Sequence, residues 1–130
     1  GALGNGLPRP TVEVSPQHRV MVRHDGREYL ISARHLMKAG VPGVTTRRDD
    51  SEFTLIHIAC ADHQIVLAEG APMETFFTGP MAVRALGMPP RLSLMIALPE
   101  LATGTNPMTP ARPFIKHHEY MQMLTASTAV

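Results

Sequence analysis

The sequence has almost no cysteine, no tryptophan and no long apolar run. Cys60 is the single cysteine among 130 residues, so an internal disulfide is excluded, and paired cysteines with zinc-ligand spacing are missing. Every apolar stretch is far shorter than the roughly 20 residues of a membrane-spanning helix. The first residues contain no cationic segment followed by an apolar one, which a signal peptide would have. With no nucleotide-binding, metal-binding or catalytic-triad motif either, we expect neither a cofactor nor a metal site.

The chain also lacks an excess of charge of either sign. Twelve basic and eleven acidic residues give a net charge of +1, and hydrophobic residues make up 44% of the chain. A chain of this length can form one domain with a real core. Balanced charge gives no electrostatic reason to bind nucleic acid or an anionic membrane, so we expect neither as a partner.

Short strands and turns are predicted up to residue 79. Residues 19–22 and 28–31 flank Asp25-Gly26, a step typical of a tight hairpin turn, and residues 11–14 alternate as a strand does. Ser32 is placed to cap a short helix that ends at Gly40. A second hairpin is predicted between residues 53–60 and 64–70.

Helices are predicted from residue 80 onward. Residues 79–87 begin with Gly-Pro and end with Gly, as a short helix does, whereas residues 90–101 fit either an apolar helix or a buried extended segment. Residues 114–127 predict an amphipathic helix, whose apolar side would carry Phe114, Ile115, His118, Met121 and Leu124. We therefore expect a β region over residues 1–79 and a helical extension over residues 80–130 that packs on it.

The stretch "SPQHRV", residues 15–20, interrupts two apolar runs. Pro16 has no amide hydrogen for a sheet, so it marks an edge, a bulge or a break. His18 can exchange a proton near neutral pH because its ordinary pKa lies there. The stretch is thus either a plain strand kink or the place where an acid–base residue is presented.

Two further places carry candidate chemistry. Asp62 and His63 are adjacent, and a carboxylate beside an imidazole can fix its tautomer and raise its basicity, although "ADH" also suits a simple turn. Cys60 has histidines three residues away on either side, but on an apolar strand it is expected to be a small buried hydrophobe. His117, His118 and Glu119 are interpreted as a solvated helix face, since neighbours on a helix point about 100° apart.

Several stretches resemble the later part of the bacterial Hint domain, the fold shared by hedgehog autoprocessing domains and inteins. The resemblance covers nearly the whole chain. "SPQHRV" is similar to the motif in which a serine or threonine precedes a histidine by three positions. "HQIVLAEGAPMETF" is similar to the closing strand pair, and "ARPFIKHHEY" to the helical tail of bacterial members. The resemblance implies a mainly β Hint fold with a C-terminal helical tail.

The same resemblance implies self-cleavage. In Hint domains a cysteine or serine adds to the preceding carbonyl and converts an amide into a thioester or ester, which releases an upstream passenger. His18 would then donate a proton to the departing nitrogen, and Ser15 would supply a hydrogen bond to the scissile amide. Asp62 and His63 match the region where inteins place a second histidine or acid.

The sequence departs from the family pattern in two places, at the opening motif and at the closing residues of the domain. No cysteine-led opening motif precedes "GALGNG", and residues 73–75 contain no asparagine, so splicing is not expected. We expect a domain that lacks its first segment and is inactive alone. Its expected partner is the missing N-terminal part or a second copy of the chain. The alternative is a non-catalytic structural or binding module that keeps the fold.

Overall fold

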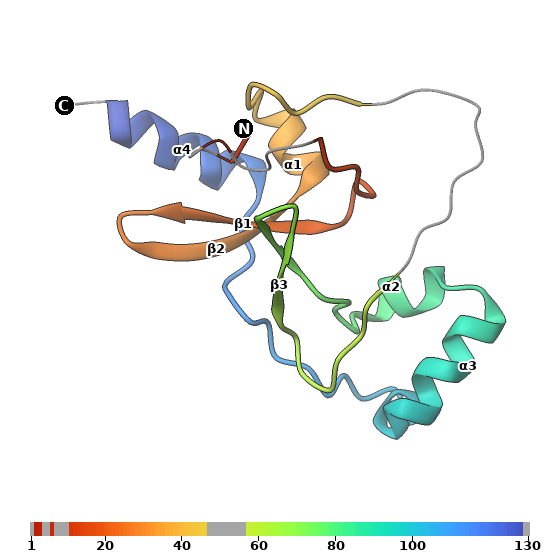
Figure 1. The fold of residues 1–130 in the computed structure, drawn as a ribbon. Coiled ribbons are helices and arrows are strands. Elements are labelled where there is room, and N and C mark those ends of the chain that lie inside the picture. Colours follow the sequence, from red (N-terminus) through yellow and green to blue (C-terminus); the bar gives the residue numbers. More distant parts are fainter. Residues whose placement is uncertain (1, 4–5, 7–10, 47–56, 129–130) are drawn as a thin grey trace. The chain divides into compact units, whose positions relative to one another are not determined.

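The structure is a computed structural model that describes residues 2–3, 6, 11–46 and 57–128 (Figure 1). The chain forms two compact units. The first comprises Gly1–Ile56, Ile65–Glu74 and Arg112–Val130, and the second comprises His57–Gln64 and Thr75–Ala111. The elements in chain order are β1 (Arg19–His24), β2 (Arg27–Ser32), α1 (Ala33–Lys38), β3 (Ile65–Ala68), β4 (Ala71–Glu74), α2 (Pro80–Ala85), α3 (Met88–Ala97), the 3₁₀ helix η1 (Pro99–Thr103) and α4 (His117–Thr128). The domain boundary expected at residue 79 stays a prediction.

A four-stranded antiparallel sheet with the order β2-β1-β4-β3 organises the first unit. Strands β1 and β2 form the predicted hairpin, in which Arg19 pairs with Ser32 and His24 with Arg27. Asp25 and Gly26 have φ angles of 50° and 74°, the left-handed values that a tight hairpin turn needs. This part of the prediction is confirmed.

The second hairpin differs from the prediction. Strand β3 pairs with β4 across the Glu69-Gly70 turn, whose φ angles of 52° and 79° are again left-handed. Residues 53–56 of the expected partner strand lie outside the described residues, and residues 57–60 are not a strand. In its described part the predicted pairing is therefore wrong, because the tight turn follows β3 instead of preceding it.

Helix α1 begins and ends where the sequence indicates. The Ser32 hydroxyl accepts a hydrogen bond from the His35 backbone N–H at 3.3 Å, which satisfies one of the amides that have no partner inside a helix. Gly40 follows the helix with φ of 74°, and its N–H donates to the Met37 carbonyl. Leu36 is the side chain of α1 that is buried in the core.

The core of the first unit lies between the sheet and the two helices α1 and α4. Its buried members are Val20, Val22, Ile31, Leu36, Ala71, Met73 and Ile115. Tyr120 and Met123 of α4 pack against this cluster, whereas Met121 and Leu124 are 46% and 43% exposed. The predicted apolar side of the C-terminal helix is therefore wrong, although the helix itself is present.

The shift of this helix has a backbone cause. The segment before it runs parallel to β2: the Leu30 N–H donates to the Pro113 carbonyl at 2.8 Å, and the Ile115 N–H donates to the Leu30 carbonyl at 2.9 Å. Phe114 and Ile115 are extended there and cannot belong to α4. Arg112 also pairs with Glu28 at 2.9 Å, and this hydrogen bond holds the pKa of Glu28 below its usual 4.5.

The second unit is built from short helices and loops. Residues 90–101, for which the sequence left two possibilities, are helical through most of α3 and continue into η1. Val83, Leu94 and Met108 are its buried apolar side chains. Among the described residues, no helix has the length and hydrophobicity needed to cross a membrane.

Candidate functional site

The stretch Ser15–His18 forms a turn that leads into β1. The His18 N–H donates to the Ser15 carbonyl at 3.1 Å, with Pro16 and Gln17 between them. Proline suits the second position of such a turn because its φ is already fixed. Residues 11–14 are not a strand, although Val12 and Val14 pack against the core. Pro16 therefore marks a break before the sheet and not a kink within a strand.

Helix α1 holds this turn through its first amides. The Ala33 N–H donates to the His18 carbonyl at 2.9 Å, and the Arg34 N–H donates to the Pro16 carbonyl at 2.8 Å. Amides in the first turn of a helix have no partner within it, so they are available for such contacts. Ser15 and His18, both half-buried, are thus presented on one turn whose backbone is tied to the sheet and to α1.

His63 lies in the second unit and is 5% exposed. Its Nδ1 accepts a hydrogen bond from the Ala111 backbone N–H at 2.8 Å, and the ring centroid is 4.9 Å from that of Phe77. An Nδ1 that accepts a hydrogen bond carries no proton, so a neutral ring carries its proton on Nε2. The Ala111 backbone amide therefore defines the tautomer of a neutral His63 ring.

Asp62 is exposed in a bend of the same unit. No described residue pairs with its carboxylate, so the expected support of His63 by Asp62 is not among the contacts. The catalytic roles of Asp62 and His63 stay predictions, as do those of Ser15 and His18. The two pairs belong to different units.

The family model described as Hint domain matches residues 1–80. The chain belongs to the Hint domain family. No curated protein and no solved structure matches it. The match includes all four candidate residues and ends at the first residue of α2. Together with the antiparallel sheet and α4, it confirms the expected Hint-type β-fold with a C-terminal helix. At the level of the family, this match supports a Hint-type autoprocessing module.

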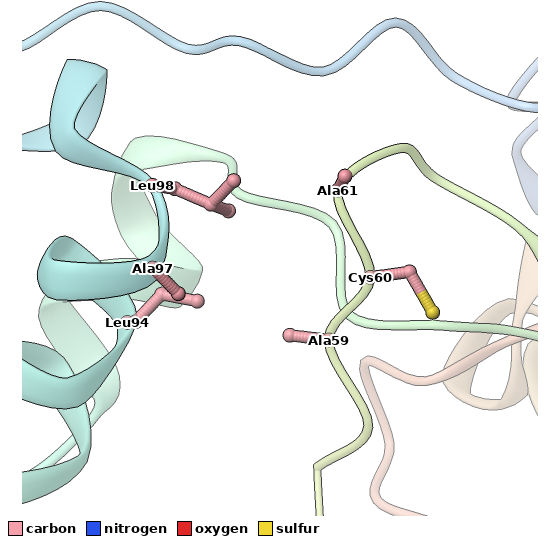
Figure 2. A pocket seen from close by; sticks show the side chains of 6 residues that line it. All are labelled: Ala59, Cys60, Ala61, Leu94, Ala97 and Leu98. Carbon is pink, nitrogen blue, oxygen red and sulfur yellow. The ribbon is translucent and has the colours of Figure 1, made fainter.

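Cys60 of this Hint domain is half-buried and lies in a loop, so the expectation that it sits on a strand is wrong. It lines a cavity of about 130 Å³ together with Ala59, Ala61, Leu94, Ala97 and Leu98. Figure 2 shows its sulfur pointing away from the α3 side chains that form the opposite wall. None of these lining residues can act as an acid or base, so the cavity offers nothing that would activate the thiol.

A histidine pair joins α1 to the start of α4 in the first unit. The Nδ1 atoms of His35 and His117 are 3.1 Å apart, and the rings are stacked with centroids 5.3 Å apart. The His117 backbone N–H also donates to His35 Nδ1 at 3.0 Å. His117 is therefore not part of a solvated face, as the sequence suggested, whereas His118 is exposed. Within the described residues, no group of three or more metal-ligating side chains lies close enough to hold an ion.

Acid is expected to weaken this contact. Desolvation lowers the pKa of both His35 and His117 below 6.5. The pKa of His35 is lowered further by the His117 ring and by the positive charges of Arg34, Lys38 and Lys116. The pKa of His117 is lowered further by Lys38, His118 and Lys116. The Glu119 carboxylate accepts from the Lys116 backbone N–H. The unfolded chain binds these protons more readily than the folded chain does. The contribution of the pair to stability is therefore fully present above the unfolded pKa of 6.5 and is lost as the pH falls through the lowered folded pKa values.

Urea unfolding followed by circular dichroism between about pH 8 and about pH 5 measures this loss. His35→Gln and His117→Gln should each make the unfolding midpoint less dependent on pH than in the unsubstituted protein. His57→Gln, at an exposed histidine of the second unit, is the matched control and should keep the full dependence. An equal acid loss in all four proteins would contradict the assignment to this pair.

Sequence reasoning missed two residues that the structure makes prominent, His35 and Glu74. Glu74 is 6% exposed at the end of β4, and its carboxylate pairs with Arg19. A weak signal existed, since an acidic residue ends one apolar strand and a basic residue begins another. His35 meets a residue 82 positions away, and no local pattern indicates such a contact.

Proposed function

We propose that the chain acts in self-cleavage of an upstream passenger, as part of a Hint module that performs an N-to-S or N-to-O acyl shift. The observation that carries the proposal is the turn from Ser15 to His18, in which a family motif with a hydroxyl and an imidazole sits on a backbone fixed by three hydrogen bonds. A reaction that moves one proton at one atom depends on such orientation.

The proposed step is an exchange of acyl partners. The thiol or hydroxyl of a cysteine or serine that opens the domain adds to the carbonyl carbon of the preceding peptide bond and loses its proton. The carbon–nitrogen bond then breaks, and the nitrogen leaves as an amine after His18 donates a proton to it. Ser15 hydrogen-bonds the scissile amide and polarises it. Water hydrolyses the resulting thioester or ester, which frees the passenger as an acid and restores the nucleophile.

The test uses the full open reading frame that encodes these residues, with any residues encoded before Gly1 included. Passenger release is followed on a gel, and the intermediate is trapped with hydroxylamine, which cleaves thioesters and esters but leaves amides intact. Release that hydroxylamine accelerates supports the acyl shift. A protein that stays uncleaved under both conditions would instead be the alternative, a non-catalytic module with a Hint fold.

One observation favours a binding role in addition, and the proposed partner is a second copy of this chain. Helix α3 exposes Met88, Leu92 and Ile96 by 61%, 53% and 82% at a spacing of four residues, which puts them on one face. The single charged residue of α3, Arg91, donates to the Arg84 and Leu86 carbonyls of its own unit. An uncharged apolar face can meet its own copy across a two-fold axis without like-charge repulsion.

We expect the purified chain to show the mass of a dimer at high concentration and of a monomer on dilution. Ile96→Glu should abolish the dimer, because it places a charge in the apolar contact. Leu67→Glu is the matched control: it is 73% exposed on β3, an edge strand among the described residues, and should leave the dimer intact. Light scattering over a dilution series measures both. Loss of the dimer in Leu67→Glu alone would assign the contact to the β3 edge, and a monomer at every concentration would remove the second copy as partner.

A further inference from the structure

Glu74 places a buried carboxylate at the beginning of β1. Its side chain is 6% exposed, and one oxygen, Oε2, accepts a hydrogen bond from the Arg19 backbone N–H at 2.7 Å. The other oxygen, Oε1, pairs with the Arg19 guanidinium at 3.3 Å. A carboxylate is costly to bury unless charges and hydrogen bonds compensate it, and Arg19 of the neighbouring strand supplies one of each.

The partner of Glu74 is itself held in place. The Arg19 guanidinium lies 3.8 Å from the centre of the Phe114 ring, in the segment that runs beside β2. Stacking on an aromatic face restricts the guanidinium while leaving its edge available for a carboxylate. Strands β1 and β4 are also paired next to this site, at Val20 and Met73.

These contacts act on the peptide group that joins His18 to Arg19. Its carbonyl oxygen accepts from the Ala33 N–H at 2.9 Å, and its N–H donates to Glu74 Oε2 at 2.7 Å. One side of this peptide plane is therefore fixed by the start of α1, and the other by the end of β4. On the preceding side, the His18 N–H donates to the Ser15 carbonyl. With the peptide planes on both sides of its Cα fixed, the His18 side chain leaves the backbone in one direction.

We propose that Glu74 is a positioning residue for His18: its carboxylate fixes the peptide plane that follows His18 and so aims the imidazole at the scissile amide. This inference rests on the proposed function in that His18 is the proton donor. Glu74 itself transfers no proton in the step. Its buried carboxylate suits the task because a charged acceptor makes a stronger hydrogen bond with an amide than a neutral one does.

Two variants of Glu74 separate the hydrogen bond from the ion pair. Glu74→Ala removes both contacts, whereas Glu74→Gln keeps an oxygen that can accept from the Arg19 N–H but carries no charge. Glu28→Ala is the matched control. Glu28 is also paired with arginines, Arg23 and Arg112, but sits near the hairpin turn at the other end of β1.

Amide hydrogen exchange of Arg19 in this chain is the first measurement. Glu74→Ala should exchange about 10-fold faster or more, because a charge-assisted hydrogen bond is lost, and Glu74→Gln should lie between it and the unsubstituted protein. In the same samples, the chemical shifts of the His18 ring should move in Glu74→Ala and stay unchanged in Glu28→Ala. Unchanged Arg19 exchange and an unchanged His18 ring in a folded Glu74 variant would overturn the inference.

Passenger release from the full open reading frame is the second measurement. Glu74→Ala should slow release by about 10-fold relative to the amount of folded protein, because a displaced donor loses much of its effect, and Glu28→Ala should leave the rate unchanged. If Glu74→Ala does not fold, Glu74→Gln carries both measurements. If the Glu74 variants change the chemical shifts of the His18 ring but His18→Ala leaves release unaffected, the proposed function fails. The role of Glu74 in positioning the His18 side chain would still hold. Slow release in His18→Ala with normal release in folded Glu74→Ala would overturn the inference alone.

Discussion

Replacing His18 by alanine is expected to slow passenger release by about 10²-fold or more, because one positioned proton donor is lost. An amine leaves a tetrahedral carbon poorly unless its nitrogen is protonated as the bond breaks. The hydrogen bonds of the turn from Ser15 to His18 join backbone atoms and do not involve the imidazole ring. The alanine variant should therefore keep its fold. Time courses of release from the full open reading frame, quantified on a gel, measure the effect.

Two companion variants make this experiment specific. Ser15→Ala should slow release less, by about 5-fold, because a neutral hydrogen bond contributes roughly 1 kcal/mol net. His118→Ala removes an exposed imidazole from α4 and should release the passenger at the unsubstituted rate. If the His18 variant releases its passenger as fast as the His118 variant, His18 has no part in the mechanism.

Features governed by neighbours in the chain could be predicted from the sequence. The Asp25-Gly26 turn follows from the ease with which these two residues adopt a positive φ, and the Ser32 cap from a hydroxyl one residue before a helix. The motif around His18 was found for the same reason, since a proline and a histidine interrupt an apolar pattern locally. The Hint family was also indicated by stretches of sequence that each lie in one continuous segment.

Features governed by distant residues could not be predicted in this way. The face of α4 that packs against the core depends on the pairing of Phe114 with Leu30. These two residues are 84 positions apart in the sequence. The resemblance implied a closing strand pair over residues 63–76, which β3 and β4 form, whereas the residue pattern alone predicted residues 53–60 as the partner of β3. Glu74 gains its importance from Arg19, a contact across 55 positions.

Truncation of Ile31 to alanine is expected to cost about 2–5 kcal/mol of the free energy of unfolding, the largest stability effect that we predict. Ile31 is fully buried on β2 and belongs to the cluster that contains Val20, Leu36 and Ile115, which joins the sheet to α1 and to the segment before α4. Removing three carbon atoms there leaves a cavity that these elements cannot fill without losing their own register. Since a domain of this size is stable by only about 5–15 kcal/mol, the loss is a large share of the total.

A graded pair and an exposed control decide this prediction. Ile31→Val removes one methylene group and should cost about 0.5–1.5 kcal/mol, and it remains measurable if the alanine variant does not fold. Leu67→Ala, at a side chain that is 73% exposed, should change stability by less than about 0.5 kcal/mol. Because the chain has no tryptophan, urea unfolding is followed by far-ultraviolet circular dichroism. Equal midpoints for Ile31→Ala and Leu67→Ala would mean that the sheet and the two helices of the first unit do not share this core.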